Sequence, residues 1–116
     1  MRLRSDIWVS AYLRRCGVDG VGAVLRRRGA PEAGAIVVRV DRLDGRSALF
    51  GLAPPSLATG RERGVERVFA PMHEAEWIDE NAAEQRLARE LSFDPDLWII
   101  EVEDREGRPR LDLAGR

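Results

Sequence analysis

The hydrophobic pattern of this chain changes its period near residue 21, and this change limits the folds that the chain can adopt. Before it, apolar residues from Ile7 to Cys16 cover about two thirds of a helical wheel and leave Ser10 and Arg14 as a narrow polar stripe. After it, short apolar or alternating runs are separated by Gly, Pro and Asp, as is typical of strands. We therefore expect a mostly buried N-terminal helix, capped by Ser5 and followed by a sheet.

Turn signals indicate how the expected strands connect. Asp44-Gly45 lies between two apolar runs, and both residues tolerate the positive φ of a tight hairpin. We expect an antiparallel meander, with a short last strand that pairs back at a sheet edge because Pro109 cannot donate to a central ladder. The strands are expected at residues 23–28, 35–43, 47–52, 65–71 and 97–104, and at the edge at 108–113.

The run 35–43 alternates in a way that assigns its two faces. The apolar residues at positions 36, 38 and 40 share one face, which we expect to meet the core. Val37, Arg39 and Asp41 share the opposite face, which we expect to meet solvent.

Residues 74–91 predict one long helix, because they are strong helix formers with carboxylates early and Arg86 and Arg89 late, the order that the helix dipole favours. Its broad, Ala-rich side suits packing on a sheet. The expected architecture is α+β, an antiparallel sheet of about five strands with an N-terminal helix and one long helix packed on one face. The length fits a single α+β domain over residues 1–116, since domains commonly have about 100–150 residues.

The charged residues have two unusual features. All 19 cationic side chains are Arg, which excludes Schiff-base chemistry on lysine and a lysine-containing phosphate loop. The net charge is only -1, yet residues 1–50 hold ten Arg against five acids, and residues 51–116 hold nine Arg against fifteen acids. These halves, at +5 and -6, indicate either ion pairing within the fold or between subunits, or a basic face for an anionic partner. The sequence pI of about 5.9 favours ion pairing.

The sequence also limits the location of the protein and the chemistry of its thiol. Its longest apolar runs are far shorter than the roughly 20 residues that span a bilayer, so we expect no membrane segment. Asp6 and Arg14 interrupt any signal-like stretch, which indicates a cytoplasmic protein. Cys16 is the single cysteine, so no internal disulfide can form, and we expect it to be a small core residue rather than a reactive thiol.

Candidate catalytic and metal-binding residues are few. His73 is the single histidine and could act as a general base, but no nucleophile elbow accompanies it. The acidic residues between Asp94 and Glu106 lack the spacing of a calcium loop, and a solvated acidic edge explains them better. We expect no catalytic residue, no metal and no cofactor.

The candidate binding residues are aromatic and Arg side chains of the first half. Trp8, Tyr12 and Arg15 are spaced at i, i+4 and i+7, so they share one flank of the first helix and could form a cation–π set, although core or interface packing explains the two aromatics just as well and more often. Successive residues of the run 26–28 point to opposite faces of a strand, so at most two of its three Arg can meet one anion. The full candidate set is Trp8, Tyr12, Arg14, Arg15, Arg26, Arg28, Arg39 and Arg42.

Three functional hypotheses follow from these features. The first is a non-enzymatic binding or assembly module, which we expect to be a homodimer or to bind a protein partner, because Arg, Trp and Tyr concentrate interface energy. The alternative is a nucleic-acid or anion-binding domain that uses the Arg-rich first half, although the acidic pI disfavours it. The second alternative is a small hydrolase or transferase centred on His73.

Several segments resemble a known family. They are residues 3–16 (LRSDIWVSAYLRRC), 33–35 (AGA), 42–45 (RLDG), and 93–98 (FDPDLW) leading into 101–104 (EVED). Together they resemble a small bacterial family of single-domain proteins known as domain of unknown function 1491. The likeness extends over nearly the whole chain and implies no catalytic residue, cofactor or substrate. Members are short stand-alone proteins, which implies that this chain is an entire protein.

Overall fold

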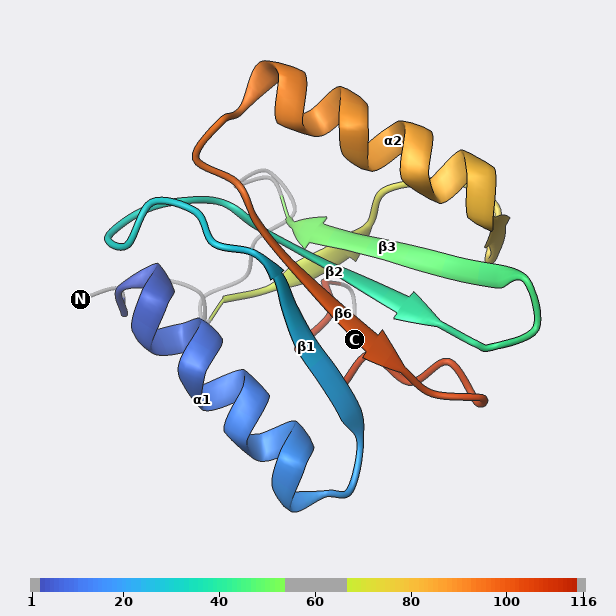
Figure 1. The fold of residues 1–116 in the computed structure, drawn as a ribbon, viewed down its shortest axis with the longest axis horizontal. Coiled ribbons are helices and arrows are strands. Elements are labelled where there is room, and N and C mark those ends of the chain that lie inside the picture. The colour runs from blue at the N-terminus through green and yellow to red at the C-terminus, as the bar shows by residue number, and fades with distance from the viewer. Residues whose placement is uncertain (1–2, 54–66, 115–116) are drawn as a thin grey trace.

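The structure of the protein is a computed structural model that describes residues 3–53 and 67–114. Within these residues two helices accompany a mixed sheet (Figure 1). In chain order the elements are α1 (Ser5–Val18), β1 (Gly22–Arg27), β2 (Ile36–Asp41), β3 (Arg46–Leu52), β4 (Phe69–Pro71), β5 (Ile78–Asp79), α2 (Glu80–Phe93) and β6 (Trp98–Glu103).

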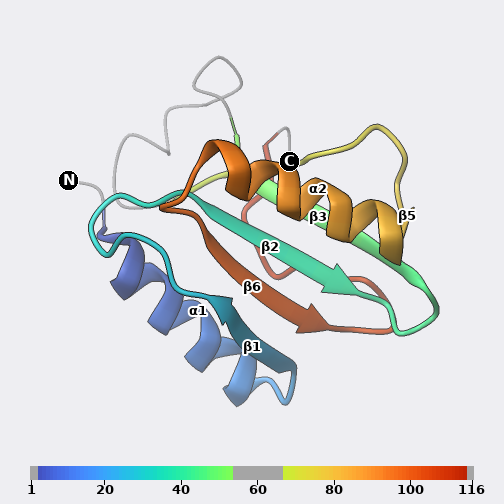
Figure 2. The ribbon, with the colours of Figure 1, turned by 45° about the horizontal axis from the view of Figure 1, so that its top comes forward.

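The sheet has the strand order β1-β6-β2-β3-β4. The end of β3 pairs with β4, and its start, Arg46 and Ser47, pairs with β5. β6 is antiparallel to β1 but parallel to β2, so the last long strand lies between the first two (Figure 2). The predicted α+β class with a mostly antiparallel sheet is confirmed, but the predicted meander is wrong for β1 and β2. The reason is that β6 is apolar on both faces over Trp98–Ile100, and only a central position buries both.

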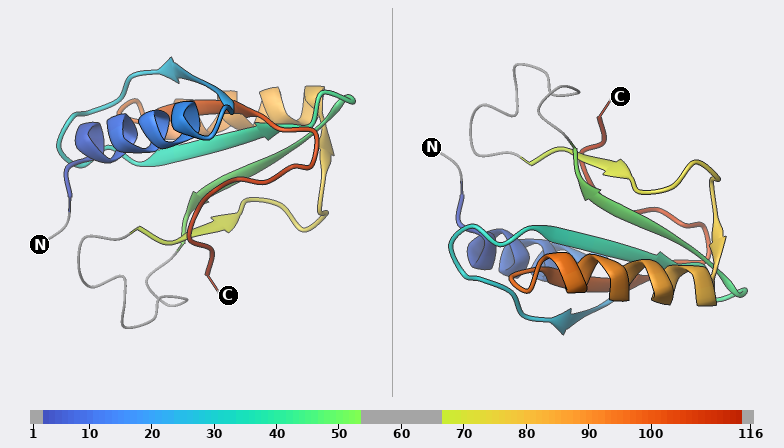
Figure 3. Two further views of the ribbon diagram at one scale, coloured as in Figure 1. Left: turned by 90° about the horizontal axis from the view of Figure 1, so that it is seen from below. Right: turned by 90° about the horizontal axis from the view of Figure 1, so that it is seen from above.

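The two helices cover opposite faces of the sheet. Figure 3 shows α1 in front of the sheet from below and α2 in front of it from above. Val38 and Ile100 pack against α1, whereas Val37 and Ile99 pack against α2. The predicted solvent face of β2 is therefore wrong. Val37 and Arg39 are buried, since α2 covers that face.

α1 follows the predicted range closely but differs in its cap and its burial. Ser5 is the first helical residue rather than the cap, and its buried Oγ donates to the carbonyl of Gly34 at 2.7 Å. Val9, Tyr12 and Cys16 are buried, as expected for one side of the helix. Ile7, Ala11 and Val18 are exposed, and Trp8 and Leu13 are only partly buried, because a helix that lies on the outside of a sheet can bury only the side that faces it. The prediction of a mostly buried helix is therefore wrong.

α2 begins six residues later than predicted, at Glu80. Ile78 and Asp79 instead pair with β3, and the Asp79 carboxylate then caps the helix by accepting from the N–H of Ala82 at 2.8 Å. Leu87 is buried on the sheet, as the predicted packing requires.

The predicted Asp44-Gly45 hairpin is confirmed, with Gly45 at a φ of +87° and the N–H of Arg42 donating to the carbonyl of Arg46. The predicted strand 65–71 begins only at Phe69 within the described residues, and positions 65 and 66 lie outside them.

The predicted edge strand 108–113 does not pair back onto β6. This segment instead crosses to β4, where the N–H of Phe69 donates to the carbonyl of Asp112 at 2.8 Å. Tyr12 anchors its start by donating to the carbonyl of Pro109 at 2.6 Å. Neither helix in the described part of the chain is long and apolar enough to cross a membrane.

Candidate functional site: the surface of helix α1

The structure gathers five of the eight predicted binding residues around α1 and places the other three elsewhere. Trp8, Tyr12 and Arg15 lie on one flank of the helix, and Arg14 lies on its exposed surface. Arg28, which follows β1, borders a groove on the other flank. We call this region the α1 surface; it comprises Ile7, Trp8, Ser10, Ala11, Tyr12, Leu13, Arg14, Arg15, Val18, Leu25, Arg28 and Trp98.

The first flank carries the predicted aromatic and Arg set. The rings of Trp8 and Tyr12 are stacked, with centroids 5.1 Å apart and an interplanar angle of 10°. The Arg15 guanidinium carbon lies 5.5 Å from the centre of the Tyr12 ring, which confirms the expected cation–π geometry. Tyr12 is buried, and burial is the main cause that raises the pKa of its hydroxyl. The set is therefore held rigidly, with Trp8 and Arg15 lining a pocket of about 260 Å³.

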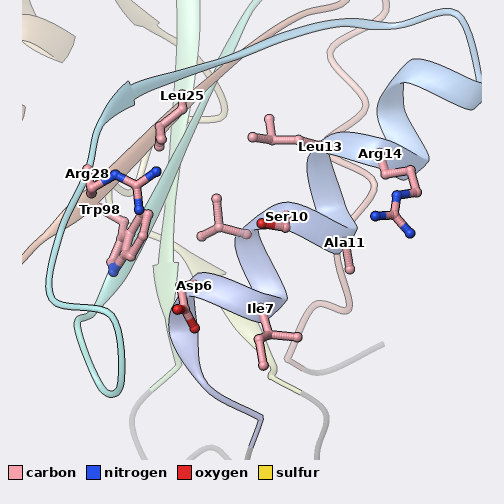
Figure 4. Close-up of a pocket in the computed structure, with 10 residues that line it drawn as sticks. Asp6, Ile7, Ser10, Ala11, Leu13, Arg14, Leu25, Arg28 and Trp98 are labelled. Atoms are coloured by element: carbon pink, nitrogen blue, oxygen red, sulfur yellow. The ribbon is translucent and has the colours of Figure 1, made fainter.

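The second flank is a groove of about 450 Å³ between α1 and β1 (Figure 4). The guanidinium carbon of Arg28 lies 5.4 Å from the centre of the Trp98 ring on one wall. The indole N–H of Trp98 donates to the carbonyl of Ala30 at 2.7 Å, which fixes the ring. From the opposite wall, Leu13 points toward Leu25, as the close-up shows. The groove thus combines apolar walls, which Ser10 and Asp6 interrupt, with a cation at its edge.

The outward side of α1 forms a third part of the surface. Ile7, Ala11, Arg14 and Val18 follow the spacing i, i+4, i+7 and i+11, so they share one side of the helix. Ile7 is 49% exposed and Val18 is 82% exposed. Sequence reasoning placed Arg14 on the solvent side but missed the apolar part of this stripe, because it assigned the apolar residues from Ile7 to Cys16 to a mostly buried arc.

The charge of the α1 surface is positive. Among the described residues, Arg14, Arg15 and Arg28 form no ion pair. Asp6, the carboxylate that lines the groove, is paired with Arg4 at 3.1 Å. These cations are therefore available to an anionic partner.

Arg26 and Arg39 do not belong to this surface, because they form ion pairs with carboxylates of the second half. Arg26 alternates with Leu25, which faces the α1 side, so it points to the α2 side of the sheet, where it pairs with Glu84 and, at 3.0 Å, with Glu101. The buried Arg39 also pairs with Glu84. The Arg26 hydrogen bond is the main cause that lowers the pKa of Glu84. For these two residues the predicted ion pairing within the fold is confirmed.

Arg42 is the third predicted residue outside the α1 surface. Its guanidinium carbon lies 4.7 Å from the centre of the Trp77 ring, and its Nε is 3.8 Å from Asp44. Arg42 therefore packs against Trp77 at the β2–β3 hairpin and does not contribute to the α1 surface.

His73 borders a cavity of about 490 Å³, but both of its ring nitrogens are engaged by the backbone. Nε2 accepts from the N–H of Leu49 at 2.9 Å, and Nδ1 lies 2.7 Å from the carbonyl of Ala75. The ring therefore carries its proton on Nδ1 and connects β3 to the segment before β5. This geometry does not support a role for His73 as a general base.

Cys16 is fully buried, and burial is the main cause that raises the pKa of its thiol, as expected for an inert core residue.

Among the described residues, five carboxylates of the second half form ion pairs with Arg: Glu84, Glu90, Glu101, Asp104 and Glu106. Asp104 is buried and accepts hydrogen bonds from Arg108 and Arg110, both at 2.9 Å. Within residues 3–53 and 67–114, no three His, Cys, Asp or Glu side chains are grouped to hold a metal ion.

Comparisons with known proteins identify the relatives of this chain. No curated protein matches the sequence. The crystal structure of a DUF1491 family protein from Caulobacter crescentus CB15 is 33% identical, with a TM-score of 0.76, and the match covers 97% of this chain and 98% of that chain. The solution structure of a protein from A. tumefaciens is 38% identical, with a TM-score of 0.79, and the match covers 100% of this chain and 98% of that one.

The family described as "Protein of unknown function (DUF1491)" matches residues 3–112, which is almost the entire chain. The resemblance expected from residues 3–16 and 93–104 is thus confirmed. Because this match agrees with the solved structures in both sequence and fold, the chain belongs to the DUF1491 family.

Proposed function

We propose that this protein is a small non-enzymatic binding or assembly module of the bacterial cytoplasm, and that it forms a homodimer through the α1 surface. The observation that carries the proposal is the exposed stripe of α1, Ile7 to Val18, between two pockets, together with Arg14, Arg15 and Arg28, which form no ion pair among the described residues.

The composition of the α1 surface supports a protein interface. Trp8 and Arg15 border one flank, and Arg28 with the rigid Trp98 borders the other. Aromatic and Arg side chains that are held in place before binding lose little conformational entropy when a partner docks. The apolar side chains between them would be removed from water in the same contact.

Charge supports a second copy as the partner. Among the described residues, the second half of the chain exposes carboxylates that form no ion pair, including those of Glu74, Glu76, Asp96 and Glu103. The first half exposes Arg14, Arg15 and Arg28 in the same condition. A second copy therefore supplies the opposite charge that the α1 surface lacks within its own subunit.

The test is light scattering coupled to size-exclusion chromatography at micromolar concentration, in low and high salt. We expect a dimer at low salt that weakens at high salt, and a monomer for the double variant Arg14→Glu/Arg28→Glu. The matched control is Arg46→Glu/Arg105→Glu, which makes the same charge change at exposed positions away from α1. A wild-type monomer in both salts would overturn the self-association.

Binding of nucleic acid or another polyanion is the alternative proposal, supported by the three cations of the α1 surface. It is the weaker one, because Arg26, Arg39 and Arg42 already have partners within the fold. Titration with labelled RNA and DNA tests it, since phosphate contacts predict affinity that falls steeply with salt. No affinity at low salt would remove this alternative.

A further inference from the structure

We infer that the groove between α1 and β1 receives the end of α2 from a second copy, with Phe93 entering the groove and Asp96 facing Arg28. This inference rests on the proposed function and names the segment that occupies the site. It follows from the matched chemistry and placement of two features, one exposed segment and one groove.

The exposed segment is an apolar side chain next to an available carboxylate. Phe93 is the last residue of α2 and is 80% exposed. The turn after it is fixed by hydrogen bonds, with the N–H of Asp96 donating to the Asp94 carboxylate at 3.0 Å and the N–H of Leu97 donating to the Asp94 carbonyl at 3.3 Å. The Asp96 side chain is exposed and forms no ion pair in the described structure. The segment thus presents a phenyl ring and a negative charge in a defined arrangement.

The groove offers the complement of that arrangement. Leu13 and Leu25 form apolar parts of its facing walls, and Arg28 lies at its edge above the Trp98 ring (Figure 4). Aromatic rings favour such apolar surfaces, and an Arg without an ion pair favours a carboxylate. The one carboxylate that lines the groove, Asp6, is already held by two hydrogen bonds from Arg4.

The placement of the two features suits a reciprocal exchange. The loop after α2 runs beside the loop that carries Arg28, since the N–H of Ala30 donates to the carbonyl of Asp96 at 3.0 Å. Figure 2 shows the end of α2 and the start of α1 at the same end of the sheet. The groove, however, lies on the α1 face, and α2 covers the opposite face, so a second copy is the source of the segment. A two-fold axis at this end would let each copy fill the groove of the other, which closes the assembly as a dimer.

The first experiment measures the dimer dissociation constant of Phe93→Ser by sedimentation equilibrium at low salt. We expect it to rise by about tenfold or more, because the phenyl ring loses its apolar site. The matched control is Val24→Ser, which removes another exposed apolar side chain, 61% exposed and outside the groove, and should leave the constant unchanged. Both side chains are exposed, so circular dichroism should report folded proteins.

The second experiment is a charge reversal between the two proposed partners. Arg28→Asp and Asp96→Arg should each weaken the dimer, and the double variant should regain most of the lost affinity, since each new charge would meet its opposite across the interface. A dimer that is indifferent to Phe93→Ser and shows no recovery in the double variant overturns this docking and leaves the proposed dimer standing. A wild-type monomer overturns both.

Discussion

At the scale of single residues, the contact between Gly107 and Trp77 fixes the loop after β6. Gly107 has a φ of +73°, and a Cβ added there would lie 2.1 Å from Cη2 of Trp77. The guanidinium of Arg42 packs on the face of the same ring, 4.7 Å from its centre. A larger residue at position 107 would therefore have to displace a ring that already has a packing partner.

We predict that Gly107→Ala lowers the free energy of unfolding by roughly 2–4 kcal/mol, from the left-handed backbone and the clash together. Urea denaturation measures this loss. Gly20→Ala is the control, because Gly20 has the same φ of +73° with no atom within 4 Å of the added Cβ. It should lose only about 1–2 kcal/mol, the part due to the backbone. Equal losses of unfolding free energy at the two positions would show that the Trp77 ring moves aside without cost.

Asp104 shows how a buried carboxylate stays ionised. Burial alone would raise the pKa of Asp104, but hydrogen bonds from Arg108, Arg110 and the N–H of Glu106 together outweigh it and hold the pKa well below its ordinary value. A carboxyl whose pKa is lowered by folding stabilises the folded protein above the pKa of the unfolded chain, about 3.9. That stabilisation is lost as the pH falls through the pKa of the folded state.

We predict that Asp104→Asn lowers the free energy of unfolding at pH 7 by roughly 1.5–3 kcal/mol, because charged hydrogen bonds are lost and Arg110 remains partly buried. Denaturation of both proteins from pH 7 to pH 2 checks the sign. The difference should be constant above about pH 5 and shrink below about pH 4. A difference independent of pH would contradict the ionic role of Asp104.

Residue contacts within one helix were predictable, and those between distant segments were not. The stacking of Trp8, Tyr12 and Arg15 follows from their spacing on α1, and the buried Cys16 follows from the same wheel. The Gly107–Trp77 contact joins positions 30 residues apart through a loop, and neither residue carries a local signal of it.

At the scale of elements, one carboxylate of α2 connects the helix to two strands. Glu84 accepts from Arg26, which lies at the bulge of β1, and from the buried Arg39 of β2. Arg39 also donates to the hydroxyl of Ser47 on β3 at 3.2 Å. The helix is thus positioned over the sheet by charge as well as by its apolar side.

We predict that Glu84→Gln lowers the free energy of unfolding by about 1 kcal/mol, a modest value because Glu84 is partly exposed to solvent. Hydrogen exchange should show the larger local effect, with faster exchange over the first turns of α2. Glu76→Gln, at an exposed position before β5, removes the same charge and should change stability by less than about 0.5 kcal/mol. Equal effects of the two variants would show that the network does not hold α2.

Element types were largely predictable, whereas their partners were not. The alternation of β2 identifies a strand, but it cannot show that α2 covers the face of Arg39. A charged residue in a strand predicts a solvent-exposed face unless its ion-pair partner is known. For Arg39 that partner is Glu84, which lies 45 residues later in the sequence. The two grooves beside α1 were missed for the same reason, since each is formed with residues far away in the chain.

At the scale of the whole molecule, the fold depends on the insertion of its last long strand between its first two. β6 pairs with β1 from Gly22–Glu103 to Arg27–Ile99 and with β2 from Ile36–Trp98 to Asp41–Glu103. Local turn signals predict hairpins between strands that are neighbours in sequence. They therefore could not predict that β6 pairs with β1 and β2. The run of apolar residues Trp98–Ile100, which places apolar side chains on both faces of β6, is the sequence feature that indicates a central strand.

This topology predicts that the first 96 residues cannot fold without β6. In such a fragment β1 and β2 lose their common neighbour, and Trp98, Ile100 and Val102 are missing from the core beneath α1. We expect the fragment to lack a cooperative thermal transition by circular dichroism and to show poorly dispersed amide signals by NMR. A chain that ends at Ala114 is the control, because it keeps every residue that the structure describes, and it should unfold cooperatively near the wild-type temperature. A cooperative transition in the 96-residue fragment would mean that β1 and β2 reach a stable sheet without β6, and that the insertion completes the fold rather than creating it.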